Sequence, residues 1–410
     1  MRIPKKIVLF CLGMVLFFSP FSKKYTLFFL RPAVIIWFLA TIFLALRREK
    51  LNFPSIGKFF IFFFFTVFIS LFFSTDFYYS QKLFFYRFSL FILFPFVCSF
   101  CIDRYNEVKF LTLFALLGAT VVGIDALFQF FTGIDFINSY SVAKEVDGSS
   151  LSALLGPFGW YTQLGAYSAF VSVATLILIL FLRKKVFQRI LLVFLFLLML
   201  FSLIFSLSRG AWASFFLSLL IVSFIISRNI QIKKNRRMQS KILYFYVTVL
   251  LMCFLIFKLN LRKTDVFNKE TLLSGRDEIW REAVSLIKKY PLFGIGLYRA
   301  PFLISSGKDA HNTYLNLLLE TGLLGFVPFI LILTLYLKEM ISFFLNIDLK
   351  KAAYLFVFFS ICLGFLINDL KEATMLGGWD LGIFFWLSLG ISLRGMELFE
   401  RGYKNLNNDE

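Results

Sequence analysis

Residues 190 to 227 form one almost unbroken apolar run, and this run constrains the fold more than any other feature of the sequence. A membrane-spanning helix needs about 20 apolar residues, so the run is too long for one crossing and has to turn. Ser206-Leu-Ser208-Arg209-Gly210 is the place where it can do so. The run therefore predicts two membrane-spanning helices joined by a very short connection that carries an arginine.

Apolar runs of similar length recur along the whole chain of 410 residues, of which 59% are hydrophobic. Soluble domains do not contain such a series of runs, so the sequence predicts an all-α polytopic membrane protein with about twelve transmembrane helices. The predicted spans are residues 7–22, 25–46, 57–74, 83–102, 108–131, 161–182, 190–207, 210–227, 242–259, 313–337, 352–369 and 379–394.

The distribution of lysine and arginine predicts the orientation. Cytoplasmic loops of membrane proteins are enriched in these residues, so the net charge of +19 does not indicate nucleic-acid binding, and anionic membrane lipids are the expected partners. The basic clusters fall on one side of the membrane, at residues 47–50, 183–185, 228–241, 350–351 and in the tail at 395–410. Both ends are then cytoplasmic. Lys23 and Lys24 break the rule, which makes the first hairpin the least determined part of the topology.

The connections 75–81, 132–160 and 260–312 are predicted to lie outside. The second is rich in Gly, Ser and Asp and is expected to be a surface loop with a turn at Gly156-Pro157. The third is a long outer loop between the ninth and tenth spans, which the family resemblance given below would place in the periplasm. The predicted organisation is spans one to nine in 1–259, this loop in 260–312, spans ten to twelve in 313–394 and a cytoplasmic tail in 395–410.

An amphipathic helix is expected inside that loop, at residues 275–289. At about 100° per residue, its apolar arc consists of Ile279, Trp280, Ala283, Val284 and Ile287. Arg276 falls in the middle of this arc, and Ser274 can cap the helix in a capping box with Asp277. The alternative is an interfacial helix lying on the bilayer, but such a helix keeps its cations on the polar side. Because an unpaired guanidinium facing the protein body is costly, we expect an anionic group to meet Arg276.

Two further polar positions lie at the predicted outer face. Arg209 is held close to the helices by its short connection, and the alternative is that it reaches outer-leaflet phosphates. Arg87, about one turn inside the fourth span, is a weaker candidate of the same kind.

The only histidine, His311, stands where the outer loop enters the tenth span, at a helix start that favours negative charge. A lone histidine is often structural, but this one shares its face with Arg209 and Arg276 and has Asp309 nearby. Asn312 and Tyr314 add polar neighbours. Glu320, about two turns further in, is an intramembrane carboxylate that either pairs with an arginine or satisfies neighbouring helices.

Cysteine and carboxylate patterns give no sign of a metal or cofactor. The five cysteines lie in or beside apolar runs. Cys98 and Cys101 have the spacing of a redox motif but no strand–helix context and no partner histidine, so we interpret them as helix-packing residues. No Asp-x-Asp pair stands on the predicted outer face. We therefore expect neither a metal site nor a cofactor.

Taken together, these motifs resemble those of the O-antigen ligase and O-antigen polymerase superfamily of bacterial membrane glycosyltransferases. The residues that carry the resemblance are Ser208-Arg209-Gly210-Ala211-Trp212, Arg276 followed by Trp280, Pro291 followed by Gly294 and Gly296, His311-Asn312-x-Tyr314-Leu315 followed by Glu320, Gly322 and Gly325, and the earlier Gln129 with Gly133 and Gly156-Pro157-Phe158. They span most of residues 120 to 330 and agree in order, spacing and topology.

The resemblance implies that Arg209 and Arg276 bind the diphosphate of an undecaprenyl-linked glycan and that His311 acts at the acceptor hydroxyl. Arg87, Asn312 and Tyr314 would add to substrate binding, with Asp309 and Glu320 in support. Arginine makes bidentate contacts to phosphate and stabilises the charge that grows on the leaving group, and histidine can take the acceptor's proton. Direct attack would invert the anomeric carbon, and the arginines would replace a metal.

The function expected from this resemblance is that of an O-antigen ligase, which transfers a glycan from undecaprenyl diphosphate to lipid A–core at the periplasmic face of the inner membrane. The alternatives are an O-antigen polymerase, which extends lipid-linked chains, and a transferase that acts on protein hydroxyls, because no motif reports the acceptor. A non-enzymatic flippase for the same lipid is the contrasting class. Its charges would line a path at mid-membrane depth, whereas here they gather at one face.

Overall fold

The computed structural model describes residues 2–46, 54–143, 152–182, 185–229, 276–377 and 379–408, and within them it is helical apart from loops and two isolated β-bridges. The longer helices are α1 (Arg2–Phe18), α2 (Lys23–Leu46), α3 (Gly57–Leu71), α5 (Ser89–Cys101), α6 (Tyr105–Thr132), α7 (Tyr161–Phe181), α8 (Val186–Phe205), α9 (Arg209–Arg228), α13 (Arg276–Lys289), α15 (Thr313–Asn346), α16 (Ala353–Asn368) and α18 (Trp379–Asn408). Short elements are α4 (Phe77–Leu83), η1 (Phe84–Phe88), η2 (Gly156–Phe158), α14 (Ala300–Leu303) and α17 (Thr374–Gly377).

Eight helical segments in these residues are long and apolar enough to cross a membrane, which makes the chain a multi-pass membrane protein. Every predicted span within the described residues coincides with a helix, and the span at 242–259 lies outside them. The apolar helices α3 and α16 have only 15 and 16 residues, and α1 has 17. Because a full crossing needs about 20 residues, the count of twelve crossings stays a prediction.

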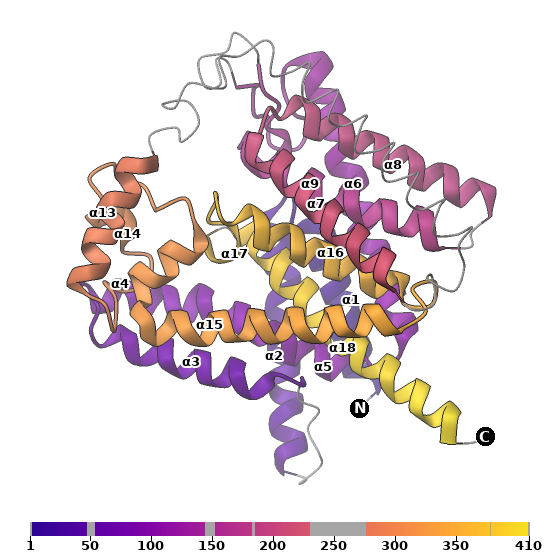
Figure 1. Cartoon of the computed structure of the whole chain (residues 1–410), viewed down its shortest axis with the longest axis horizontal. Coiled ribbons are helices and arrows are strands. Elements are labelled where there is room, and N and C mark those ends of the chain that lie inside the picture. The colour runs from indigo at the N-terminus through magenta and orange to yellow at the C-terminus, as the bar shows by residue number, and fades with distance from the viewer. Residues whose placement is uncertain are drawn as a thin grey trace.

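The centre of the bundle consists of α7, α16 and α18, which the other helices surround (Figure 1). Trp386 of α18 is fully buried and lies against Phe60, Phe91 and Phe329 from three other helices. Cys98 is also buried, and a Cβ added to Gly390 of α18 would lie 3.0 Å from its sulfur, as expected of a helix-packing residue. By contrast, α2, α3 and α8 expose many large apolar side chains, which is the surface that hydrocarbon requires.

The connections predicted to lie outside meet at one end of the bundle. Asp76 pairs with Arg299 at 3.2 Å, which joins the turn after α3 to the loop after α13. Asn138 donates to the carbonyl oxygen of Phe21 at 3.4 Å, which joins the 132–160 connection to the turn between α1 and α2. The backbone of Leu154 donates to Phe205 at the end of α8 at 2.9 Å. These contacts hold each connection against neighbouring helix ends, and the outer location of the connections stays a prediction.

The 132–160 connection is more tightly folded than the predicted surface loop. Gln129 of α6 donates to the Tyr140 carbonyl oxygen and accepts from the backbone of Leu155 and Gly156. Leu154 and Phe158 are buried, and the predicted turn at Gly156-Pro157 forms the 3-10 helix η2. Residues 144–151 lie outside the described residues.

A break inside α15 shapes the region around the histidine. Gly322 adopts φ 62° and ψ −168°, so the helix is interrupted there and its first turns run at an angle to the rest (Figure 1). The backbone N–H groups of Ile295 and Gly296 donate to the freed carbonyl oxygens of Leu319 and Glu320, at 3.0 and 2.9 Å. A Cβ on Gly322 would lie 2.3 Å from the backbone of Leu292. Glycine is therefore required here both for its positive φ and for the close approach of this loop.

Candidate active site

The helix α13 begins at Arg276 in the described residues and has the amphipathic character predicted for 275–289. Ile279 and Ala283 are buried, and the indole N–H of Trp280 donates to the Ala310 carbonyl oxygen at 2.8 Å. The assignment of Val284 to the buried face was wrong, because 42% of its surface is exposed at the edge of the arc. Ser274, the predicted cap, lies outside the described residues.

Arg276 meets the anionic group that its position predicts. Its Nη2 lies 2.9 Å from Oε1 of Glu372, and its Nη1 donates to the Lys371 carbonyl oxygen. The Arg276 and Glu372 side chains are 19% and 17% exposed, so water screens the pair only in part. The partner comes from the connection between α16 and α17, far away in the sequence, and the carbonyl contact fixes the guanidinium against that connection.

His311 lies beside the same carboxylate. Its Nδ1 is 3.6 Å from Oδ1 of Asp309 and 4.0 Å from Oε2 of Glu372. Its backbone N–H donates to Asp309 at 2.8 Å and its φ is 46°, in the left-handed region that favours glycine. Such a conformation is strained for a non-glycine residue and persists only where the surroundings impose it. Both carboxylates approach Nδ1, and a third of the His311 side chain is exposed.

The connection between α16 and α17 is held firmly against the start of α15. The buried carboxylate of Asp369 accepts from the Thr313 hydroxyl at 2.5 Å and from the backbone of Thr374 and Met375 at 3.0 and 2.7 Å. The backbone N–H of Thr313 lies within hydrogen-bonding distance of two carbonyl oxygens in the connection, those of Asp369 and Glu372. His311 and Glu372 therefore keep a fixed relative position.

Arg209 lies near this connection, at the start of α9. It is the first residue of α9, which Ser208 caps by accepting from the Ala211 N–H at 3.3 Å. A Cβ added to its neighbour Gly210 would lie 3.9 Å from Cδ of Lys371. Burial and the guanidinium groups of Arg276 and Arg209 lower the pKa of Lys371. Arg209, Arg276 and His311 thus converge on one short segment, residues 369–372.

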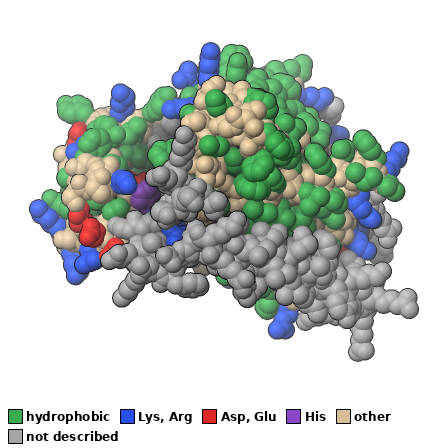
Figure 2. Space-filling model, turned by 90° about the horizontal axis from the view of Figure 1, so that it is seen from above, with side chains coloured by type: hydrophobic (Ala, Val, Ile, Leu, Met, Phe, Trp, Pro, Cys, Tyr) green, Lys and Arg blue, Asp and Glu red, His purple; other side chains and the backbone are tan. Residues whose placement is uncertain are grey.

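Burial and neighbouring charged groups have opposite effects on the ionisation of Glu372. Burial raises its pKa, and Arg276 and His311 act in the opposite direction by favouring the carboxylate. Figure 2 shows the histidine of the chain among acidic and basic side chains at one end of the molecule. The cluster thus holds three cations (Arg209, Arg276 and Lys371), the imidazole of His311 and the carboxylates of Asp309 and Glu372. Another anion that replaced Glu372 at Arg276 would meet the same guanidinium.

The other predicted site residues lie around this cluster rather than in it. Asn312 caps α15 by accepting from the Leu315 N–H at 2.9 Å and donates to the Leu370 carbonyl oxygen at 3.0 Å. The Tyr314 hydroxyl donates to the Leu366 carbonyl oxygen at 2.7 Å. Glu320 is buried next to the break in α15. Arg87 belongs to the π-helical turn η1, and its side chain lies outside the described residues.

The sequence analysis missed Asp369, Lys371 and Glu372, although a signal for them was present. These three charged residues lie close together in the short connection between two apolar spans. The alternation of spans places that connection on the same face as His311. Charged residues in so short an outer connection must lie close to the helix ends.

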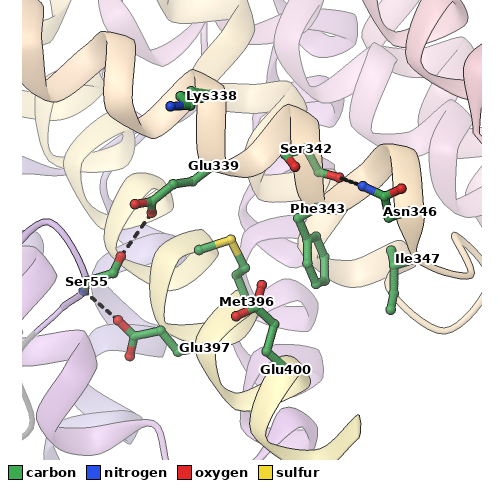
Figure 3. Close-up of a pocket in the computed structure, with 10 residues that line it drawn as sticks. All are labelled: Ser55, Lys338, Glu339, Ser342, Phe343, Asn346, Ile347, Met396, Glu397 and Glu400. Atoms are coloured by element: carbon green, nitrogen blue, oxygen red, sulfur yellow. Dashed lines mark hydrogen bonds between the residues drawn. The ribbon is translucent and has the colours of Figure 1, made fainter. Parts of the chain in front are cut away.

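A cavity of about 660 Å³ lies elsewhere, between α15, α18 and Ser55 (Figure 3). The Ser55 hydroxyl donates to Glu339 at 3.0 Å and its backbone N–H to Glu397 at 2.6 Å. Glu400 also lines it. These carboxylates repel a diphosphate. Glu339 lies in the second half of α15, whereas His311 directly precedes the first turn of that helix, and Glu397 and Glu400 belong to α18. This cavity is therefore not the candidate site.

In the described ranges, no group of three or more His, Cys, Asp and Glu side chains is arranged to hold a metal ion.

The fold and the cluster define a polytopic membrane protein with a cationic site at one end of its helix bundle. Residues 194–330 match the family model described as O-antigen ligase, which confirms the resemblance over this part of the chain. Members of this family are glycosyltransferase-like enzymes. The match contains Arg209, Arg276 and His311, whereas Lys371 and Glu372 lie beyond it. No curated protein matches the chain significantly.

Proposed function

We propose that this protein is an O-antigen ligase, which transfers a glycan from undecaprenyl diphosphate to lipid A–core at the periplasmic face of the bacterial inner membrane. The observation that carries the proposal is the convergence of Arg209, Arg276 and His311 on residues 369–372, from three separate parts of the chain. Two guanidinium groups and one imidazole at a common place suit a reaction in which a diphosphate leaves and a hydroxyl attacks.

Arg276 and Arg209 would bind the diphosphate of the donor. Glu372 lies 2.9 Å from one edge of the Arg276 guanidinium, so a diphosphate would compete with this carboxylate. As the bond between the anomeric carbon and the phosphate oxygen breaks, the electron pair stays on that oxygen. The fixed arginines stabilise the resulting charge without reorganisation.

His311 would accept the proton of the acceptor hydroxyl as its oxygen attacks the anomeric carbon. The carboxylates of Asp309 and Glu372 face Nδ1, which favours a proton on that nitrogen and leaves Nε2 as the base. The new glycosidic bond forms on the face opposite to the leaving group, so the configuration inverts. The proton ends on His311 and the negative charge on undecaprenyl diphosphate.

Asn312 and Tyr314 would support the site rather than touch the substrate. Both side chains hold the start of α15 against the end of α16, and this position fixes His311. In this respect the proposal departs from the substrate-binding roles that the family resemblance suggests.

The test is turnover by the purified full-length protein in detergent, with a lipid-linked glycan donor and lipid A–core as acceptor. Glycan-bearing lipid A–core together with free undecaprenyl diphosphate is the expected result. Extension of the lipid-linked chain instead would identify a polymerase, and glycosylation of an added protein acceptor would identify a protein transferase. No turnover with any acceptor, combined with movement of the donor across a vesicle membrane, would identify a flippase and refute the proposal.

A further inference from the structure

Lys371 is a charged residue that neither the sequence motifs nor the family match explains, since the match ends at residue 330. It follows Asp369 in the connection between α16 and α17, where hydrogen bonds to Thr313 and Asn312 fix the backbone. Its own N–H donates to the Asn368 carbonyl oxygen at 2.9 Å. The lysine is therefore presented by a rigid segment.

Lys371 lies close to both arginines of the site. On one side its aliphatic chain approaches Gly210, whose added Cβ would lie 3.9 Å from Cδ and 4.0 Å from Cβ of the lysine. Gly210 directly follows Arg209 at the start of α9. On the other side Arg276 donates to the lysine's own carbonyl oxygen. Helices α9 and α13 thus bring one guanidinium each to a segment that adds an ammonium group.

This arrangement is costly for the folded protein alone. Three like charges repel one another, and burial together with both arginines lowers the pKa of Lys371. In the described part of the chain, the adjacent carboxylate of Glu372 forms its ion pair with Arg276 rather than with the lysine. A lysine with a purely structural role would gain more from a carboxylate of its own. Charged side chains whose repulsion and burial destabilise the folded protein are typical of binding sites, where a bound ligand of opposite charge offsets that cost.

We propose that Lys371 binds the phosphate of the donor together with Arg209 and Arg276, so that the site meets a diphosphate with three cations. The identity of the donor rests on the proposed function, but the inference itself requires only that the site binds a diphosphate. The chemistry suits a third cation: a diphosphate diester carries two negative charges, and cleavage of the sugar–phosphate bond leaves an additional charge on the departing oxygen. An ammonium group on a flexible stem can follow that oxygen as a point charge.

The experiment measures binding of inorganic pyrophosphate to the purified full-length protein by titration calorimetry. The variants are Lys371→Met, which keeps the length of the side chain, Lys371→Arg, which keeps the charge, and Lys288→Met as a matched control. Lys288 is an exposed lysine of α13, the helix that carries Arg276. We expect Lys371→Met to weaken binding by about tenfold, as for loss of one charge-assisted contact. Lys371→Arg should stay within about threefold of the wild type, and Lys288→Met should match it.

Thermal stability separates binding from a structural role. Because removal of the ammonium relieves repulsion from Arg209 and Arg276, the unfolding midpoint of Lys371→Met should equal or exceed that of the wild type. Unchanged pyrophosphate affinity in Lys371→Met would overturn the inference, as would a loss of affinity that merely follows a lower midpoint. Wild-type protein without any pyrophosphate binding would overturn this inference and the proposed diphosphate site together.

The outcomes also separate this inference from the proposed function. If Arg276→Ala loses both pyrophosphate binding and glycan transfer while Lys371→Met keeps both, only the role of Lys371 fails. If pyrophosphate binding depends on Lys371 but the wild type transfers no glycan, the anion site stands and the proposed transfer fails.

Discussion

Replacement of Glu372 by Gln should have opposite effects on donor binding and on turnover. The carboxylate pairs with Arg276 at 2.9 Å and lies 4.0 Å from Nδ1 of His311. In the proposed reaction it competes with the diphosphate for Arg276, yet it also helps to orient the imidazole. Glutamine keeps the shape and one hydrogen-bond acceptor but removes the charge, so the competition weakens and the orientation of the base deteriorates.

The size of the first effect follows from the ion pair. Arg276 stays charged in the variant, so what is lost is the charge of the pair: an exposed ion pair contributes ~0.2–1 kcal/mol, and breaking a fully buried one costs ~3–5 kcal/mol. The partial burial of the pair, with side chains 19% and 17% exposed, makes the loss about 1–2 kcal/mol. Pyrophosphate should therefore bind Glu372→Gln roughly 5- to 30-fold more tightly. Turnover should fall by about tenfold or more, a part of the 10²–10⁴-fold that a positioned general base contributes.

Titration calorimetry with pyrophosphate measures the first effect, and single-turnover transfer at saturating donor measures the second. Glu278→Gln is the matched control, because Glu278 is an exposed carboxylate on the same helix as Arg276. It should leave both quantities unchanged. Unaltered pyrophosphate affinity in Glu372→Gln would refute the competition with Arg276, and unaltered turnover would refute the orientation of His311.

Three further predictions test separate parts of the structure. Arg276→Lys should lower transfer by at least about tenfold in a donor-turnover assay, since an ammonium group cannot reproduce the two contacts of the guanidinium; normal transfer would argue against bidentate binding. Asp369→Asn should destabilise the protein by about 1–3 kcal/mol in thermal unfolding, because a neutral amide replaces the buried carboxylate that accepts from Thr313, Thr374 and Met375; an unchanged midpoint would show that these hydrogen bonds do not hold the connection. Gly322→Ala should destabilise the protein by about 1–3 kcal/mol in thermal unfolding, because the φ of 62° and the backbone of Leu292 leave no room for a Cβ; an unchanged midpoint would show that the break in α15 is absent in solution.

The helical fold could be predicted because hydrophobic run length is a direct consequence of membrane thickness. The turn at Ser208-Arg209, for example, follows from a run too long for one crossing, and the structure has α8 ending at Phe205 and α9 starting at Arg209. The number of crossings could not be fixed in this way. Helices such as α3 and α16 are short, and apolar composition does not report whether a short helix crosses the membrane.

For the contacts within the site, the sequence predicted one partner but not the other. The place of Arg276 on an apolar arc required an anionic partner, but periodicity within a helix does not reveal which distant residue supplies it. Glu372 comes from a connection that only tertiary packing brings to α13. The break in α15 has the same origin, because the loop at 291–296 supplies the donors that replace its helical hydrogen bonds. Val284 was misassigned because helix periodicity alone does not define the edge of a buried face.

The most direct test of the account is single-turnover transfer from a lipid-linked glycan to lipid A–core by purified wild-type, His311→Ala and Arg276→Ala proteins. The account predicts an inverted glycosidic linkage and release of undecaprenyl diphosphate with the wild type, and loss of transfer in both variants with unchanged abundance and membrane insertion. Wild-type rates in either variant would contradict the proposed roles of these residues in a common active site.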